Sequence, residues 1–138
     1  MMRTALAWSF ICAGLLLTGC AVSASTGQQC ANGLAMNVSP ASATADHAQT
    51  SPANQVKFQA TVSPTASPGC AVPNWIMTAA PTWTNPDPRD ISIDSSSDTS
   101  MNGLATCLGA TNGPITLTAS FTLGTNAPVT QTATLSCK

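Results

Sequence analysis

The feature that most constrains the fold of this chain is an alternation of apolar and polar side chains with a period of two, which begins near residue 34. In residues 56–62, for example, every second residue is apolar, and Lys, Gln and Thr stand between them. Successive side chains of a β-strand point to opposite faces, so this pattern predicts strands with one buried and one solvated face. We therefore expect an all-β fold in which helix is almost absent.

Five stretches downstream are also predicted to be strands: residues 82–85, 91–93, 104–108, 115–121 and 129–135. Asn102 and Gly103 form a turn signal before the third of them. Threonine is frequent on the polar side, where its branched Cβ suits the pleat and its hydroxyl stays in water. The apolar side predicts one core, made of Val56, Phe58, Trp83, Ile93, Leu117, Ala119, Phe121 and Leu135.

About seven short strands in roughly 105 residues, with a tryptophan on the third main strand, are the pattern expected of an immunoglobulin-like β-sandwich. Four segments also resemble, in order, the bacterial immunoglobulin-like group 2 domain: Trp83-Thr84-Asn85-Pro86, Ile91-Ser92-Ile93-Asp94, Asn102-Gly103-Leu104-Ala105-Thr106 and Ile115-Thr116-Leu117-Thr118-Ala119. The resemblance covers about residues 34–136. It implies a sandwich that bacteria use on surface and secreted proteins as an adhesive or spacing module, with no catalytic residues. The chain departs from the family's pattern in its cysteines and in an expanded loop at residues 63–80.

The first twenty residues have the arrangement of a bacterial lipoprotein signal peptide. An apolar run follows Arg3 and leads directly into the sequence Leu-Thr-Gly-Cys, which ends at Cys20. In such a signal the cysteine thiol receives a diacylglyceryl group, and the chain is cut before that cysteine. The apolar stretch is shorter than the roughly 20 residues that cross a bilayer, so we do not expect a transmembrane helix. The alternative is an ordinary secretory signal that is cut near Ala21 or Ala24.

The chain is therefore expected to have three parts. Residues 1–19 form the signal peptide, residues 20–33 form the lipidated cysteine and a flexible tether, and residues 34–138 form one immunoglobulin-like domain. The mature protein should be extracytoplasmic and held to a membrane by the lipid on Cys20. Because Ala21 rather than aspartate follows this cysteine, the outer membrane or cell surface is the expected location in a Gram-negative cell.

Charge is scarce in this chain and argues against nucleic acid as a partner. Charged residues make up 7% of the sequence, and the formal net charge is −1. The cations outside the signal peptide, Lys57, Arg89 and Lys138, are scattered along the chain. Binding to phosphates needs a basic patch, which these three residues do not predict.

Four cysteines remain after Cys20 and are expected to form disulfides in an oxidising compartment. Zinc is the rival interpretation, but these cysteines are 30 or more residues apart and the chain has one histidine. We therefore expect no metal site and no cofactor. Consecutive antiparallel strands alternate in direction, and this alternation predicts the pairs Cys30–Cys70 and Cys107–Cys137.

Three features of the sequence are candidate sites. Asp46 and His47 lie near several serines, but a lone surface histidine beside a turn is favoured over a catalytic triad. The series Asp90, Asp94 and Asp98 lacks the Gly and Glu of a calcium loop and is interpreted as an outward strand face and the turn after it. Trp75, in the long loop, would stack on a sugar if it is exposed and would be structural if it packs against the sandwich.

Two function classes remain after these considerations. The preferred one is a non-enzymatic surface lipoprotein whose sandwich serves adhesion, protein interaction or structural display, with an envelope protein or glycan as partner. The alternative is a carbohydrate-binding module that uses Trp75 and its loop. A small hydrolase is a distant third.

Overall fold

The computed structural model describes residues 33–65 and 74–138, and within these ranges the protein is all β. Ten strands and no helix are present there, so these ranges hold no helix that could cross a membrane. The strands are β1 (Leu34–Ser39), β2 (Ser42–Ala45), β3 (Gln55–Lys57), β4 (Gln59–Pro64), β5 (Met77–Ala79), β6 (Thr82–Thr84), β7 (Ile91–Ile93), β8 (Leu104–Cys107), β9 (Ile115–Phe121) and β10 (Val129–Cys137).

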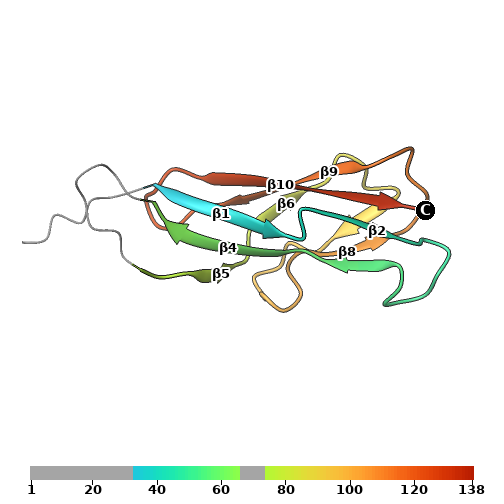
Figure 1. The fold of residues 1–138 in the computed structure, drawn as a ribbon, viewed down its shortest axis with the longest axis horizontal. Helices are drawn as coiled ribbons and strands as arrows, with labels where there is room; N and C mark the ends of the chain where they lie inside the picture. Colours follow the sequence, from blue (N-terminus) through green and yellow to red (C-terminus); the bar gives the residue numbers. More distant parts are fainter. Residues whose placement is uncertain (1–32, 66–73) are drawn as a thin grey trace, which may run out of the picture.

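The strands form three hydrogen-bonded sheets, in the orders β1-β4-β5, β2-β10-β9-β6 and β3-β8-β7. Only Phe58 separates β3 from β4, so the first and third sheets share one continuous run of chain. Figure 1 shows an elongated molecule in which β9 and β10 lie on one side and β4 and β5 lie on the other. This arrangement is consistent with a β-sandwich.

The structure contains more strands than the seven expected, for three local reasons. The predicted strand 56–62 is broken because the N–H of Phe58 donates to the carbonyl of Gly103 at 2.9 Å. The first strand is divided at Pro40, which has no N–H for a sheet ladder, and the chain passes there from β4 to the edge of β10. The segment 63–80, expected to be a loop, contains β5, which is too short to show a clear period of two.

The predicted core is confirmed in most of its members. Phe58, Trp83, Leu117, Ala119 and Leu135 are buried. The other three predicted residues are partly buried and pack against this cluster: Val56, Ile93 and Phe121. The alternation therefore predicted the inward side correctly for the strands that contain these eight residues.

The outer face of the sheet β2-β10-β9-β6 carries a hydroxyl side chain at every outward position of its paired strands. Neighbouring hydroxyl residues lie opposite one another, as in the row formed by Thr132, Thr118 and Thr84. No charged residue stands on these four strands. The expected placement of threonine on the solvated face is thus confirmed, and the face is polar but uncharged. Its residues are Ser42, Thr44, Thr82, Thr84, Thr116, Thr118, Ser120, Thr130, Thr132, Thr134 and Ser136.

A buried amide connects the core to the loop before β8. The indole Nε1 of Trp83 donates to Oδ1 of Asn102 at 2.9 Å, and Nδ2 of Asn102 donates to the carbonyl oxygens of Pro81 at 2.9 Å and Ser96 at 2.7 Å. Asn102 is only 4% exposed, so these bonds satisfy a polar group that burial would otherwise destabilise. The ring of Trp83 also lies against Phe58, with centroids 6.0 Å apart.

Position 103, directly after Asn102, requires glycine for two reasons: the backbone conformation and the lack of room for a side chain. Its φ is +82°, and a Cβ built on it would lie 2.2 Å from the carbonyl oxygen of Phe58. The turn signal at Asn102 and Gly103 was therefore a correct prediction. The sequence did not indicate that the turn lies directly against the core.

We predict that Gly103→Ala destabilises the domain much more than Gly124→Ala. Gly124 has a φ of +58° with open space around it, so alanine there should cost only about 1–2 kcal/mol for its backbone conformation. At position 103 the methyl group would also collide with the Phe58 backbone. Urea unfolding of both variants measures the difference, and equal midpoints would contradict the close contact.

Candidate functional site

A buried disulfide fastens two sheets together at one end of the molecule. Cys107 ends β8 and Cys137 ends β10, and their Cα atoms lie 5.6 Å apart across the bond. The two residues are 1% and 3% exposed. This is the pair that strand order predicts. The other cysteines assigned a role, Cys20, Cys30 and Cys70, lie outside the described residues.

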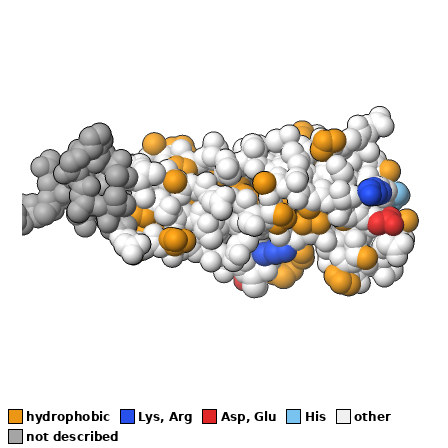
Figure 2. Space-filling model, viewed as in Figure 1, with side chains coloured by type: hydrophobic (Ala, Val, Ile, Leu, Met, Phe, Trp, Pro, Cys, Tyr) orange, Lys and Arg blue, Asp and Glu red, His pale blue; other side chains and the backbone are white. Residues whose placement is uncertain are grey.

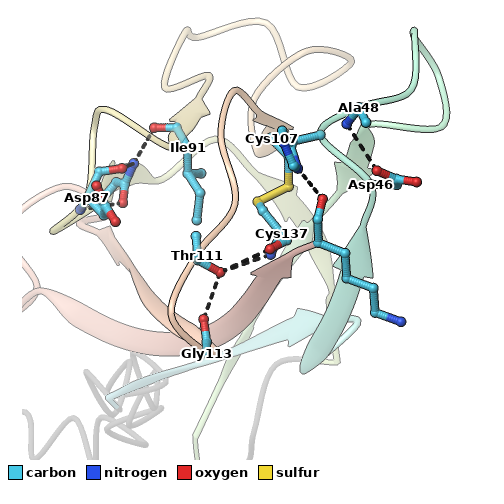
Figure 3. The surroundings of a disulfide bond; sticks show 11 residues. Asp46, Ala48, Asp87, Ile91, Cys107, Thr111, Gly113 and Cys137 are labelled. Atoms are coloured by element: carbon cyan, nitrogen blue, oxygen red, sulfur yellow. Dashed lines mark hydrogen bonds between the residues drawn. A yellow bond between two sulfur atoms is a disulfide. The ribbon is translucent and has the colours of Figure 1, made fainter.

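Hydrogen bonds from Thr111 hold the chain around this disulfide (Figure 3). The N–H of Thr111 donates to the carbonyl of Cys137 at 3.0 Å, and its Oγ1 accepts from the N–H of Cys137 at 3.0 Å. The same hydroxyl donates to the carbonyl of Gly113 at 2.8 Å. On the other side, the N–H of Cys107 donates to the carbonyl of Asn54 at 2.9 Å. Three separate segments are thereby fixed around one covalent link.

We call the surface around the disulfide the C-terminal tip, and define it as residues 46–54, 87–90, 108–114 and 137–138. Backbone hydrogen bonds join its segments: His47 donates to Lys138 at 3.0 Å, and Leu108 donates to Asp90 at 2.7 Å. Figure 1 shows the C-terminus at one end of the long axis and the start of β1 at the other. The C-terminal tip is therefore the end of the domain farthest from where the chain enters it.

Charged side chains in the described part of the chain fall into two groups. One group lies on the segments of the C-terminal tip: Asp46, Asp87, Arg89, Asp90 and Lys138. Figure 2 shows basic, acidic and histidine side chains close together at this end, and a second basic and acidic patch nearer the middle of the molecule. The other group, Lys57, Asp94 and Asp98, belongs to the loop before β8 and its immediate surroundings.

Asp46 and His47 are not arranged as a catalytic pair. The carboxylate of Asp46 accepts from the N–H of Ala48 at 3.0 Å and from Nε2 of Gln49 at 3.4 Å, so it closes its own turn. Nδ1 of His47 lies at the carbonyl oxygen of Lys138. Both side chains thus hold the C-terminal tip together, and neither hydrogen bond links them to a serine.

Asp94 and Asp98 make two similar turns in the segment that we call the 94–103 loop. Each carboxylate accepts from the N–H and the hydroxyl of the serine two residues later. These bonds favour the ionised form, so hydrogen bonding by Ser96 lowers the pKa of Asp94 and hydrogen bonding by Ser100 lowers the pKa of Asp98. Within residues 33–65 and 74–138, no group of three or more His, Cys, Asp or Glu side chains is placed to hold a metal ion.

Lys57 holds the other side of the 94–103 loop. Its Nζ donates to the carbonyl oxygens of Thr99 at 3.1 Å and Ser100 at 2.9 Å, and also to that of Asn102. An ammonium group has three donors, and here each of them has a backbone acceptor. The sequence reading treated Lys57 only as an outward strand residue and missed this role.

Trp75 is partly buried and packs against the hydrophobic core. Its neighbour Ile76 is 74% exposed and is the most exposed of the large apolar residues described. The placement favours the structural interpretation of Trp75 over the sugar-binding one, because stacking on a sugar needs an aromatic face free of protein contacts.

Comparison of this chain with protein-family models, curated proteins and solved structures finds no match.

We predict that removal of the disulfide, by Cys107→Ala together with Cys137→Ala, lowers the free energy of unfolding by about 3–4 kcal/mol in the chain-entropy model. The bond closes a segment with a sequence separation of 30. Leu108→Ala is the control, because this neighbouring side chain is 56% exposed and should matter little. Urea unfolding is the measurement, and an unchanged midpoint in the double variant would show that the bond does not stabilise the fold.

Proposed function

We propose that this chain is an envelope protein, anchored through lipid on Cys20, whose immunoglobulin-like β-sandwich presents the C-terminal tip for adhesion or for binding another envelope protein. The observation that carries the proposal is the position of the C-terminal tip, at the opposite end of the long axis from the start of β1 (Figure 1). The proposed anchor precedes β1 in the chain. The membrane would therefore lie at the other end of the domain. The proposed location of the protein is the outer membrane or cell surface.

The order of the strands supports the immunoglobulin-like part of the proposal. If β3 and β4 are counted as one strand and the short β2 and β5 are set aside, the remaining strands number seven. Numbered 1 to 7 along the chain, these strands are β1, β3 with β4, β6, β7, β8, β9 and β10. They lie in the order 1-2-5-4 in one layer and 3-6-7 in the other. This is the order of a constant-type immunoglobulin sandwich.

The distribution of charge supports binding at the C-terminal tip rather than on the hydroxyl face of the sheet β2-β10-β9-β6. The broad hydroxyl face has no charged residue, and serine and threonine are poor contributors to the energy of protein interfaces. The tip combines both signs of charge with the exposed Leu108 and is held by the disulfide. A rigid surface loses little entropy on binding, which favours recognition there.

We predict that Cys20→Ser abolishes incorporation of radiolabelled palmitate into the protein in cells. Cys20 is the proposed acceptor of the lipid, so its loss should remove the label and the membrane association together. Cys12→Ser is the control, because it removes the nearest other cysteine and should leave the label in place. Label that persists in Cys20→Ser would overturn the anchoring half of the proposal.

The second half of the proposal predicts that crosslinking to a partner depends on position within the domain. A photoreactive amino acid at Ala48, which is exposed on the C-terminal tip, should give a discrete crosslinked species in intact cells. The same group at Thr125, which is exposed in the hairpin between β9 and β10 at the opposite end, should give none. Equal crosslinking from both positions, or none from either, would contradict a binding role for the tip.

A further inference from the structure

The described part of the chain contains the dipeptide Asn-Gly twice, at residues 102–103 and 112–113. Asparagine before glycine is a reactive pair, because the backbone nitrogen of the glycine can attack Cγ of the asparagine side chain. Glycine favours this attack since it has no Cβ to shield its nitrogen. The reaction requires a side-chain amide that can turn towards the next residue and a backbone N–H that is free of other bonds. The two pairs are held in opposite ways in the structure.

The pair at residues 102–103 is held in an unreactive arrangement. Hydrogen bonds occupy both the oxygen and the nitrogen of the buried Asn102 amide. The N–H of Gly103 donates to the carbonyl of Asp94 at 2.8 Å. Neither reacting group can reach the other until the core opens around them.

The pair at residues 112–113 is free of these restraints. Asn112 is exposed, and its side chain makes no hydrogen bond to the described residues. The N–H of Gly113 has no acceptor among the described residues, in contrast to that of Gly103. Apart from its chain neighbours, a Cβ built on Gly113 would meet no atom within 4 Å, so the space there is open. Both reacting groups are thus available in the folded protein.

The fold itself keeps glycine at position 113. The φ of Gly113 is +118°, a conformation that other residues rarely adopt. Thr111 fixes this part of the chain: its hydroxyl donates to the carbonyl of Gly113 at 2.8 Å, and its N–H donates to the carbonyl of Cys137 at 3.0 Å (Figure 3). The reactive pair therefore lies on a segment that is held against the disulfide end of the domain.

We propose that Asn112 is a site of spontaneous deamidation in the folded protein, and that the reaction adds negative charge to the C-terminal tip. The nitrogen of Gly113 loses its proton to solvent and bonds to Cγ of Asn112. The Cγ–Nδ2 bond breaks, and the departing nitrogen takes up a proton and leaves as ammonia. Water then opens the resulting succinimide ring at either of its two carbonyls, which gives aspartate or isoaspartate. Water is the only co-reactant, so the step needs no enzyme and no oxidant.

The modification changes the charge of the C-terminal tip. The segments of the tip carry three aspartates, one arginine and one lysine. A carboxylate at position 112 adds another acidic group, and the isoaspartate form also lengthens the backbone there. The site exists whether or not the tip binds a partner, because the reaction uses the chain's own atoms and water.

The first test compares the two Asn-Gly pairs within one molecule. The full-length chain, purified in detergent, is incubated at mildly alkaline pH, and fragmentation of its peptides locates each converted residue. Asn112 should convert at least about tenfold faster than Asn102, a factor that corresponds to ~1.4 kcal/mol for opening the core around Asn102. In concentrated urea the two rates should become similar. A folded protein in which Asn112 stays intact, or in which both residues convert equally fast, would contradict the assignment.

The second test follows the charge of the molecule by isoelectric focusing. Every variant carries Asn32→Gln, because Asn32 is also followed by glycine and lies outside the described residues. In this background the aged protein should gain a more acidic species, and Asn112→Asp should focus at that position from the start. Asn112→Gln should prevent the change, since its longer side chain closes the ring far more slowly.

Asn37→Gln is the matched control. Asn37 is exposed, but the residue after it is Val38, whose branched side chain shields the backbone nitrogen. This variant should therefore age as the background protein does. Urea unfolding with an unchanged midpoint establishes that the variants at the exposed position 112 are folded. An acidic species that forms as fast in Asn112→Gln would place the reaction at another residue and overturn the proposal.

Discussion

The buried side chain of Asn102 is the interaction on which much of this structure depends. It binds the indole of Trp83 and the carbonyl oxygens of Pro81 and Ser96, so it joins the core, the approach to β6 and the 94–103 loop. Its burial leaves no water to replace a lost partner, which makes all of these bonds necessary together. Gly103 then allows the turn to lie against Phe58 without a collision. The position of Ser95 at the edge of β6 follows from the same turn.

The 94–103 loop and the strand β8 that follows it are fixed in different ways. Hydrogen bonds hold the loop, and a disulfide holds the end of β8. In the loop, hydrogen bonds donated by Lys57, by Asn102 and by the N–H of Trp83 to Ser95 fix the chain without burying a charge in the core. At the end of β8, the disulfide joins β8 to β10, which belong to different sheets. A chain with only 7% charged residues has few ion pairs available for such links. Among the described residues, the segments are instead held together by buried apolar side chains, by one disulfide and by hydrogen bonds to backbone carbonyl groups.

The sequence predicted best those features that depend on the two-residue period. That period placed Leu117, Ala119 and Leu135 in the core, and it put Cys137 on the same inward side, where it meets Cys107. Features set by single polar contacts were missed, because they leave no periodic signal. Nothing in the local sequence around Asn102 distinguishes a buried amide from an ordinary exposed turn, and the role of Lys57 depends on residues more than 40 positions away. The strand β5 has three residues, which are too few to show a reliable alternation of apolar and polar side chains.

The same contrast between strands and loops bears on function. The outer face of the sheet β2-β10-β9-β6 is regular and uncharged, so it offers little to distinguish one partner from another. The C-terminal tip is irregular, contains both signs of charge and is held by a covalent bond, so its shape and charge pattern can specify a partner. Binding residues are commonly found on loops that a rigid scaffold positions. If the domain is anchored to a membrane at its other end, as proposed, the C-terminal tip is the part that extends farthest from that membrane.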